Sequence, residues 1–209
     1  MHVTAIAHAK ERLKIAHDSV KKMEAADNFA EVRTAWIEFL HAVSSVYSKL
    51  EQGAKADGKS AAWYGRMKKE RKDDPLLSYL HHARNADRYG LEEIVSSEGS
   101  ASIASYLQPD GLILQIRSVG RGETTWGDKI FDEHGRLAGT KVEESWAKWA
   151  LVVTVKDNRF GDSFLPPTHH LDNPIVGQDP GFLANLSLPY LSSLIDAGEG
   201  YVIPPSQTK

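Results

Sequence analysis

The sequence predicts an α+β protein: an N-terminal antiparallel helical bundle followed by a small antiparallel β-sheet part with a C-terminal helix. Up to about residue 95, apolar residues recur at steps of three and four, as on the buried face of a helix. From Ser100 onward, short aliphatic and β-branched runs alternate with turns rich in Gly, Pro and Asp, which is typical of strands. A last apolar stretch, Gly181–Ala197, predicts a final helix. We therefore expect a helical bundle at residues 1–97 and a small β-rich domain with a late helix at residues 98–209.

The composition is that of an ordinary globular protein, with 41% hydrophobic and 25% charged residues among 209. The formal net charge of −3 gives no general reason to expect nucleic acid. Because cysteine is absent, disulfides, thiolate nucleophiles and Cys-based metal centres are excluded. No apolar run approaches the roughly 20 residues of a membrane-spanning helix, and the N-terminus lacks a signal-peptide pattern. We expect a cytoplasmic protein with no membrane association, no cofactor and no metal site.

Capping residues delimit four helices in the first part. Asp27 or Asn28 can accept a hydrogen bond from a free backbone N–H at the start of the second helix. Asp74 and Pro75 open the fourth, since Asp caps a helix and Pro fits its first turn. The short connections between the helices favour an up-and-down bundle. The four helices are expected at about residues 3–26, 28–53, 60–72 and 74–94.

The second part carries several candidate strands. Residues 132–136 form the loop of an expected hairpin, and residues 158–180 are rich in proline and are expected to form loops. The clearest strand is the last, because it is β-branched and nearly continuous. The candidate strands are Leu112–Ile116, Lys129–Phe131, Leu137–Val142 and Trp149–Val155.

Residues Gly53–Ser60 match the phosphate-loop pattern G-x-x-x-x-G-K-[ST]. The pattern predicts a nucleotide site in which Lys59 pairs with phosphate and Ser60 holds magnesium. A true phosphate loop follows a buried strand, whereas residues 44–52 continue a helical period. The alternative interpretation is a basic loop that joins two helices.

On the fourth helix, Arg84 and Asp87 interrupt the apolar stripe that Leu77, Leu80 and Leu91 form at three- and four-residue spacing. A charged residue in such a position must be paired or must point into an interface or cleft. One interpretation is a structural Arg84–Asp87 ion pair that closes the bundle. The other is a functional site, because polar and titratable residues surround Arg84 within two turns. These neighbours are His81, Asn85, Arg88 and Tyr89.

The segment Arg84–Tyr89, late in a helical bundle, resembles the motif of the HEPN superfamily. In that motif an Arg is followed by a polar residue and then by a His. Arg84 and Asn85 match the first two positions, and Tyr89 stands where the His would fall. The resemblance covers residues 1–95 and implies a four- or five-helix fold that forms a homodimer at the motif. It also implies metal-independent ribonuclease activity, or RNA binding, in an RNA-processing, toxin or defence system.

Cleavage of RNA by its own 2′-OH needs a base, an acid for the leaving oxygen and a cation for the charge on the phosphate. Arg84 is the expected cation, because a guanidinium binds phosphate in bidentate fashion, and Asn85 is expected to orient it. A Tyr with a pKa of about 10 is a poor base at neutral pH. His81 or His82 is therefore the expected base, with Tyr89 assisting.

Basic residues of the third helix, together with Arg88 of the fourth, are candidates for holding an RNA backbone. The alternative is a solvated helix face. Trp63 and Tyr64 lie beside them, and we expect these rings to point into the core rather than to stack on bases. The basic candidates of the third helix are Lys59, Arg66, Lys68 and Lys69.

His169 and His170 lie with Asp172 in a Pro-flanked loop. Adjacent residues rarely ligate one metal comfortably, so we expect a loop shaped by packing, with part of a site as the alternative. Besides a nucleotide-binding protein that uses Gly53–Ser60, two functions stay open at this point. One is a HEPN-like RNA-processing or RNA-binding protein. The other is a non-catalytic, dimerising interaction protein whose β domain docks a protein partner.

Overall fold

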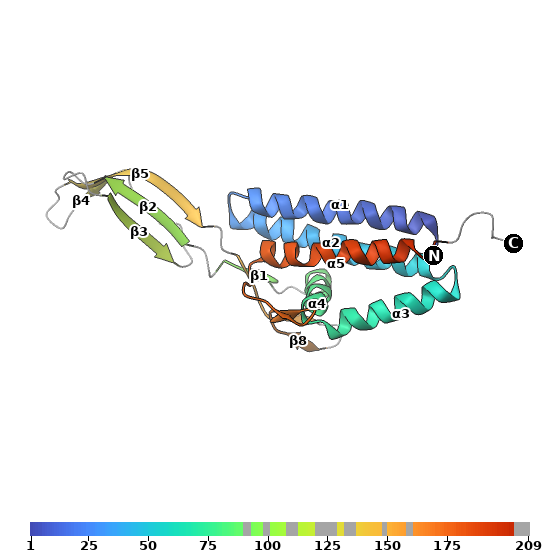
Figure 1. Ribbon diagram of the computed structural model, residues 1–209. Coiled ribbons are helices and arrows are strands. Elements are labelled where there is room, and N and C mark those ends of the chain that lie inside the picture. Colours follow the sequence, from blue (N-terminus) through green and yellow to red (C-terminus); the bar gives the residue numbers. More distant parts are fainter. Residues whose placement is uncertain are drawn as a thin grey trace.

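The computed structural model describes residues 1–89, 93–97, 101–107, 113–119, 129–131, 137–147, 150–157 and 161–202. It confirms the α+β architecture: four packed N-terminal helices, small antiparallel sheets and a C-terminal helix (Figure 1). The protein is mostly helical in this part of the chain. The helices are α1 (Val3–Ala25), α2 (Phe29–Ala54), α3 (Gly58–Asp73), α4 (Pro75–Tyr89) and α5 (Pro180–Glu199).

The two longest helices, α1 and α2, form an antiparallel hairpin whose turn is fixed by a capping box (Figure 1). The Asn28 side chain accepts a hydrogen bond from the backbone N–H of Glu31 at 3.0 Å. In return, the Glu31 carboxylate accepts one from the N–H of Asp27 at 2.8 Å. The first bond satisfies a backbone donor that the start of a helix leaves unpaired, and the second holds the residue before the cap, in a variant of the capping box. Asn28 is therefore the cap, one of the two residues that the sequence suggested.

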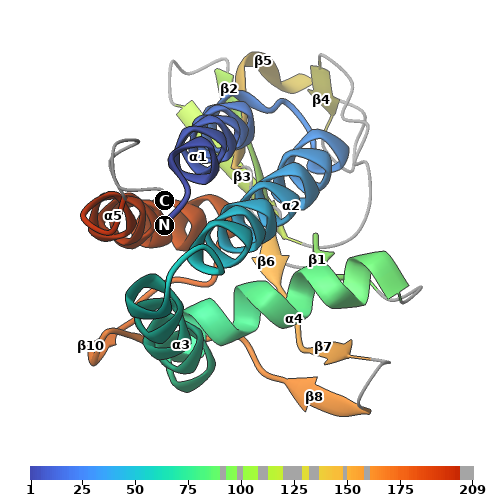
Figure 2. The same ribbon diagram turned by 90° about the vertical axis from the view of Figure 1, so that its right-hand side faces the viewer.

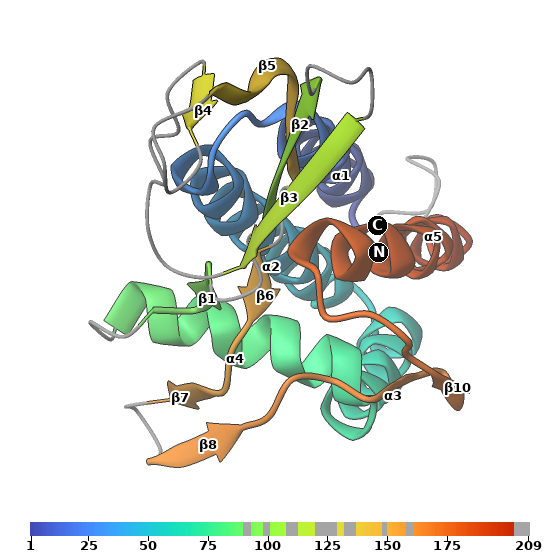
Figure 3. The same cartoon turned by 90° about the vertical axis from the view of Figure 1, so that its left-hand side faces the viewer.

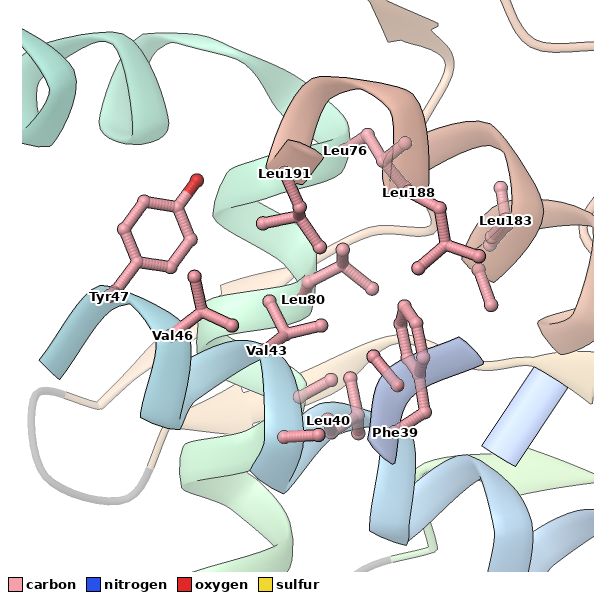
Figure 4. Packing of buried hydrophobic residues seen from close by; sticks show 14 of the residues in the cluster. Phe39, Leu40, Val43, Val46, Tyr47, Leu76, Leu80, Leu183, Leu188 and Leu191 are labelled. Carbon is pink, nitrogen blue, oxygen red and sulfur yellow. The ribbon is translucent and has the colours of Figure 1, made fainter. Parts of the chain in front are cut away.

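The C-terminal helix α5 packs against α1 and α2 and completes the helical core. Figure 4 shows Leu183, Leu188 and Leu191 of α5 facing buried side chains of α2 and α4. Gly198 permits a close approach, because an added Cβ would lie 3.1 Å from the Trp63 ring. The sequence grouped this helix with the β-rich part. Apolar periodicity shows that one face of a helix is buried, but it does not show which elements bury it.

Helix α4 ends at Tyr89, earlier than its apolar stripe predicted. Ile94 is buried, but it belongs to the segment that leads into β1 (Val95–Ser96). Leu91, the other predicted stripe residue, lies outside the described residues. The sequence extended the stripe of this helix to Ile94 and allowed a break or kink at Gly90, which lies outside the described residues; the chain is not helical at Ile94, because an extended segment that enters the core buries an apolar residue equally well.

A short neck connects the helical body to the largest sheet. β1 pairs with β6 (Leu151–Val152) in antiparallel register, with Val95 opposite Val152. Between these two strands the chain forms a four-stranded antiparallel sheet of order β3-β2-β5-β4, which extends beyond one end of the helical body (Figures 1 and 3). β4 coincides with the expected strand, and β3 and β5 overlap theirs. The strands are β2 (Ala101–Leu107), β3 (Ile113–Val119), β4 (Lys129–Phe131) and β5 (Leu137–Ala147).

Two very short hairpins lie along α4 (Figure 2). The strand expected at residues 149–155 is divided, because β6 joins the neck while β7 (Val155–Asp157) pairs with β8 (Asp162–Phe164). Between β6 and β7, the Val153 carbonyl accepts a hydrogen bond from the Tyr79 hydroxyl of α4 at 2.6 Å. β9 (His169–His170) pairs with β10 (Asn173–Pro174). α4 thus contacts α2, α3 and both hairpins, and the Arg84 and Asp74 clusters lie along it and at its start.

Candidate functional site

The Arg84 region is a row of polar side chains on α4. His81, Arg84 and Asp87 follow one another at three-residue spacing, so they lie on one ridge of the helix with neighbouring Cβ atoms about 5–6 Å apart. All three side chains are half-buried. Beyond the row, Arg88 and Tyr89 are exposed, and the Arg88 guanidinium lies 5.4 Å from the centre of the Tyr89 ring. The row therefore borders solvent at the C-terminal end of α4.

Arg84 is oriented by its neighbour. One Arg84 Nη donates a hydrogen bond to the Asn85 side-chain oxygen at 3.2 Å, and Asn85 itself is buried. The Asn85 amide nitrogen lies 3.5 Å from Nε2 of His81. The Arg84 Nε is buried and has no hydrogen-bond partner among the described residues. The chain His81–Asn85–Arg84 thus holds the guanidinium while leaving part of its donor capacity unused.

The Arg84–Asp87 ion pair, one of the two interpretations of the sequence, does not form. Asp87 instead contacts His41 of α2, with 3.1 Å between the carboxylate oxygen and Nε2. The His41 side chain is 44% exposed and that of Asp87 is 22% exposed, so solvent reaches the pair. The prediction was wrong because it considered only residues on α4, whereas packing of α2 on α4 supplies a closer partner.

His41 is a candidate that the sequence reasoning missed. It lies far from the Arg84–Tyr89 motif in sequence, and no spacing rule connects the two segments. The available signal was its position on α2, where a titratable residue follows Phe39 and Leu40 of the apolar stripe. Through Asp87, His41 adds a second imidazole to the Arg84 row, on the side opposite His81.

The two predicted histidines of α4 have different surroundings. The His82 ring stacks on Phe164 of β8, with ring centres 3.5 Å apart and planes at 7°. His82 thereby anchors the β7–β8 hairpin to α4. His81 instead belongs to the row and lies 3.5 Å from the Asn85 side chain, which makes it the better candidate for proton transfer.

The basic residues of α3 lie apart from Arg84. Lys59, Arg66, Lys68 and Lys69 are exposed, and Lys68 also lies 3.9 Å from a carboxylate oxygen of Glu51. Along the axis of α4, nine residues separate Arg84 from Pro75, which corresponds to about 14 Å. The structure therefore does not place the basic residues of α3 next to His81, Arg84 and Asp87.

The aromatic side chains beside the α3 cations belong to the core, as expected. Trp63 is 4% exposed, and Tyr64 is buried with its hydroxyl donating to the Tyr47 carbonyl at 3.0 Å. Burial raises the pKa of Tyr64 to about 12. Neither ring is available for stacking on a base.

Gly53–Ser60 is a connection between two helices rather than a phosphate loop. Gly53 lies in the last turn of α2, where an added Cβ would overlap that of Ala5, and no strand leads into the segment. The Ser60 hydroxyl is fully buried and donates to the Ala54 carbonyl at 2.8 Å. It also accepts from the N-terminal ammonium of Met1 at 3.1 Å. The nucleotide interpretation is therefore wrong, because the segment joins two helices and the Ser60 hydroxyl that would hold magnesium is already hydrogen-bonded within the protein.

A second polar cluster lies at the corner where α3 meets α4. Asp74 caps α4 by accepting from the Leu77 N–H at 2.8 Å, and its other oxygen accepts from the Leu171 N–H at 2.7 Å. His170 Nδ1 lies 3.2 Å from both carboxylate oxygens. The side chains of Asp74 and His170 are only 5% and 7% exposed. Burial acts to raise the pKa of Asp74, but the contacts from His170, Leu171 and Leu77 outweigh it and leave that pKa below its usual value.

The two adjacent histidines that the sequence singled out have different surroundings at this corner. His170 is buried on Asp74, whereas His169 is exposed and lies 3.1 Å from the Thr168 hydroxyl. Between β9 and β10, Leu171 and Asp172 adopt φ of 46° and 64°. Such left-handed conformations cost a non-glycine residue free energy. The Asp74 contacts hold this turn, so the loop is shaped by packing, as expected.

An open pocket of about 970 Å³ adjoins the corner. It is lined from α3 by Arg66, Lys69, Glu70 and Asp73, and from the hairpin by His169 and Asp172. These side chains carry charges of both signs and give the pocket no single electrostatic preference.

Comparison of the chain with protein-family models, with curated proteins and with solved structures finds no match. The resemblance to the HEPN superfamily therefore rests on the Arg84–Tyr89 motif and its place late in the bundle. In the part of the chain that the structure describes, no group of three or more His, Asp or Glu side chains could hold a metal ion. None of the described helices is both long and apolar enough to cross a membrane.

Proposed function

We propose that the protein is a HEPN-like RNA-binding protein that cleaves RNA without a metal ion at the polar row of α4. One observation carries the proposal: Arg84 lies on a ridge of α4 between His81 and Asp87, and Asp87 contacts a second imidazole, His41 of α2. His81 is three residues before it, and Asp87, which contacts His41 at 3.1 Å, is three residues after it. A cation flanked by two titratable groups is the set that internal phosphodiester transfer requires.

The reaction follows from these groups. A neutral imidazole takes the proton of the ribose 2′-OH, and the 2′-oxygen forms a bond to phosphorus. The bond from phosphorus to the 5′-oxygen of the next nucleotide breaks, and the second imidazole, in its protonated form, gives that oxygen a proton. The products are a 2′,3′-cyclic phosphate and a 5′-OH. Arg84 neutralises the charge that develops on the phosphate, with Asn85 holding its guanidinium.

His41 suits the acid role and His81 the base role. A carboxylate next to an imidazole orients the ring, as Asp87 can do for His41. His81 has a neutral amide, Asn85, as its neighbour in the row. Tyr89 and Arg88, both exposed beyond the row, offer a ring and a cation to the adjoining nucleotide. The α3 cations Lys59, Arg66, Lys68 and Lys69 would contact the backbone further along the RNA.

The test is cleavage of an end-labelled single-stranded RNA in the presence of EDTA. The parent protein should produce 2′,3′-cyclic phosphate ends, and Arg84→Ala, His41→Gln and His81→Gln should each lose most of this activity. His8→Gln, at an exposed histidine of α1, is the matched control and should keep it. Activity that survives Arg84→Ala, or that EDTA abolishes, contradicts the proposal.

A non-catalytic interaction protein is the second candidate function, and it has its own supporting observation. The four-stranded sheet stands beyond the end of the helical body, joined to it by the β1–β6 neck (Figure 1). A sheet in this position is available to a protein partner. This candidate would be favoured if the protein forms a defined complex with another protein and does not cleave RNA, whether or not it binds RNA.

A further inference from the structure

The four-stranded sheet has two edges that differ in length and regularity. Its order, β3-β2-β5-β4, leaves β3 and β4 on the outside (Figure 1). β3 pairs with β2 over seven residues without interruption, from Ile113 opposite Leu107 to Val119 opposite Ala101. β4 pairs with β5 over only three residues, and its register shifts between Ile130 and Phe131. Among the described residues, each edge strand has a ladder partner on one side only.

Only one of these edges carries the features that prevent edge-to-edge pairing. Proteins protect an open edge with short strands, bulges, lysine or proline. β4 is short, irregular in register and starts with Lys129. β3 has the sequence Ile-Leu-Gln-Ile-Arg-Ser-Val, which is long, mostly apolar and free of Pro, Gly and Lys. A regular edge of this kind leaves a row of backbone N–H and C=O groups for another strand.

We propose that β3 is a homodimerisation edge, where it pairs in antiparallel fashion with β3 of a second copy of this chain. The pairing is centred on Ile116, which then lies opposite Ile116 of the partner. In this register all seven residues find a partner, with Ile113 opposite Val119 and Leu114 opposite Ser118. Two four-stranded sheets become one eight-stranded antiparallel sheet. This inference does not depend on RNA binding or cleavage, and it places the dimer contact at β3 instead of at the α4 motif, where the HEPN resemblance would place it.

The sequence of β3 fits β3 of a second copy better than it fits β4 of a second copy. In the Ile116-centred register, its only charged residue, Arg117, lies opposite Gln115 of the partner and diagonal to the partner's Arg117, so no like charges are directly opposite each other. Pairing of β3 with β4 of another copy would cover only the three residues of β4. Such a head-to-tail contact would also leave free edges and allow open polymers, whereas β3–β3 pairing is closed by a two-fold axis.

Single cysteines test the register directly, because the chain has no cysteine of its own. Opposed residues of an antiparallel pair have Cα atoms about 4.5–5.5 Å apart, a separation that a disulfide can bridge. Under mild oxidation Ile116→Cys should form a cross-linked dimer, whereas Ile113→Cys alone should not. The double variant Ile113→Cys/Val119→Cys should cross-link again. Cross-linking of Ile113→Cys alone to the same extent as Ile116→Cys would overturn the register.

Sedimentation of the full chain tests the association itself. The parent protein should be a dimer at tens of micromolar, and Ile116→Lys should be a monomer, because it places two lysines opposite each other. Ile130→Lys on β4 introduces the same change at the other edge and should remain dimeric. Far-UV circular dichroism of all three proteins checks that the sheet is retained. A monomeric parent protein, or a dimer that Ile116→Lys leaves intact, overturns the proposal.

Discussion

The two polar clusters of α4 contain similar residue types and differ in how their hydrogen bonds are satisfied. At the α3–α4 corner, the Asp74 carboxylate accepts from two backbone N–H groups and contacts His170, all away from solvent. In the row, Arg84 has a buried Nε without a hydrogen-bond partner among the described residues, and the Asp87–His41 pair is open to solvent. Both carboxylate oxygens of Asp74 at the corner therefore have partners within the protein, whereas the guanidinium of the row keeps an unused donor.

This difference indicates which cluster stabilises the fold and which is available for function. A buried charge that is fully hydrogen-bonded holds elements together, and removing one partner leaves the other unsatisfied. A half-buried cation with unused donors is poorly suited to that task, but it is well suited to bind an oxyanion. The same distinction gives His170 a structural role and His41 the proposed catalytic role, although each lies beside an aspartate.

Asp74→Ala should produce the largest effect on stability. The substitution leaves buried His170 without its partner carboxylate, removes the cap of α4 and removes the acceptor of the Leu171 N–H. Breaking a buried pair of this kind costs about 3–5 kcal/mol of unfolding free energy. Urea unfolding measures the loss, with Asp73→Ala at the adjacent exposed carboxylate as the control that should change little. Equal stability of the two variants would remove the structural role assigned to the corner.

Arg84→Ala should have the opposite profile, with activity lost and stability nearly kept. Loss of one preorganised charge donor typically lowers a rate about 10²–10³-fold. Unfolding free energy should change by less than about 1 kcal/mol, because Asp87 keeps His41 as its partner. RNA cleavage and urea unfolding of one preparation measure both quantities. A strongly destabilised Arg84→Ala would instead assign the row to the fold.

Acid should weaken the corner in a defined direction. Contacts to the carboxylate hold the pKa of Asp74 below its usual value despite burial. Such a group stabilises the folded state above the pKa of the unfolded chain, about 3.9, and this contribution is lost as pH falls through the lower, folded-state pKa. Melting temperatures between neutral and acid pH should therefore fall less steeply for Asp74→Asn than for the parent protein. Parallel curves would show that Asp74 does not contribute to acid sensitivity.

The smallest expected effect is a gain in stability at the corner turn. Leu171 has a φ of 46°, which suits Asn better than Leu. Leu171→Asn keeps the backbone N–H that donates to Asp74 and should stabilise the protein by about 1 kcal/mol. Leu165→Asn, at a residue that is 74% exposed and has no positive φ, is the control and should be neutral. A shift of the same size and sign in both variants would attribute the gain to lost surface hydrophobicity.

Local chemistry determined much of the architecture. Apolar periodicity placed the helices of the first part, and Asn28 and Asp74 cap α2 and α4 as their side-chain chemistry predicts. The alternation of turns and aliphatic runs located β3, β4 and β5. The sequence also identified Arg84 as misplaced for an ordinary surface residue, and the structure finds it half-buried with an unpartnered Nε. These features depend on residues within a few turns of one another, which is the range that sequence patterns describe.

Contacts between distant segments were decided only by the tertiary structure. Asp87 pairs with His41 instead of Arg84, and His170 pairs with Asp74 instead of joining Asp172. Helix α5 enters the bundle core, although its sequence position suggested the β-rich part. In each case several partners satisfy the same local requirement for burial or charge. The packing of helices far apart in sequence selects one of them, because only that packing brings the two side chains within hydrogen-bonding distance.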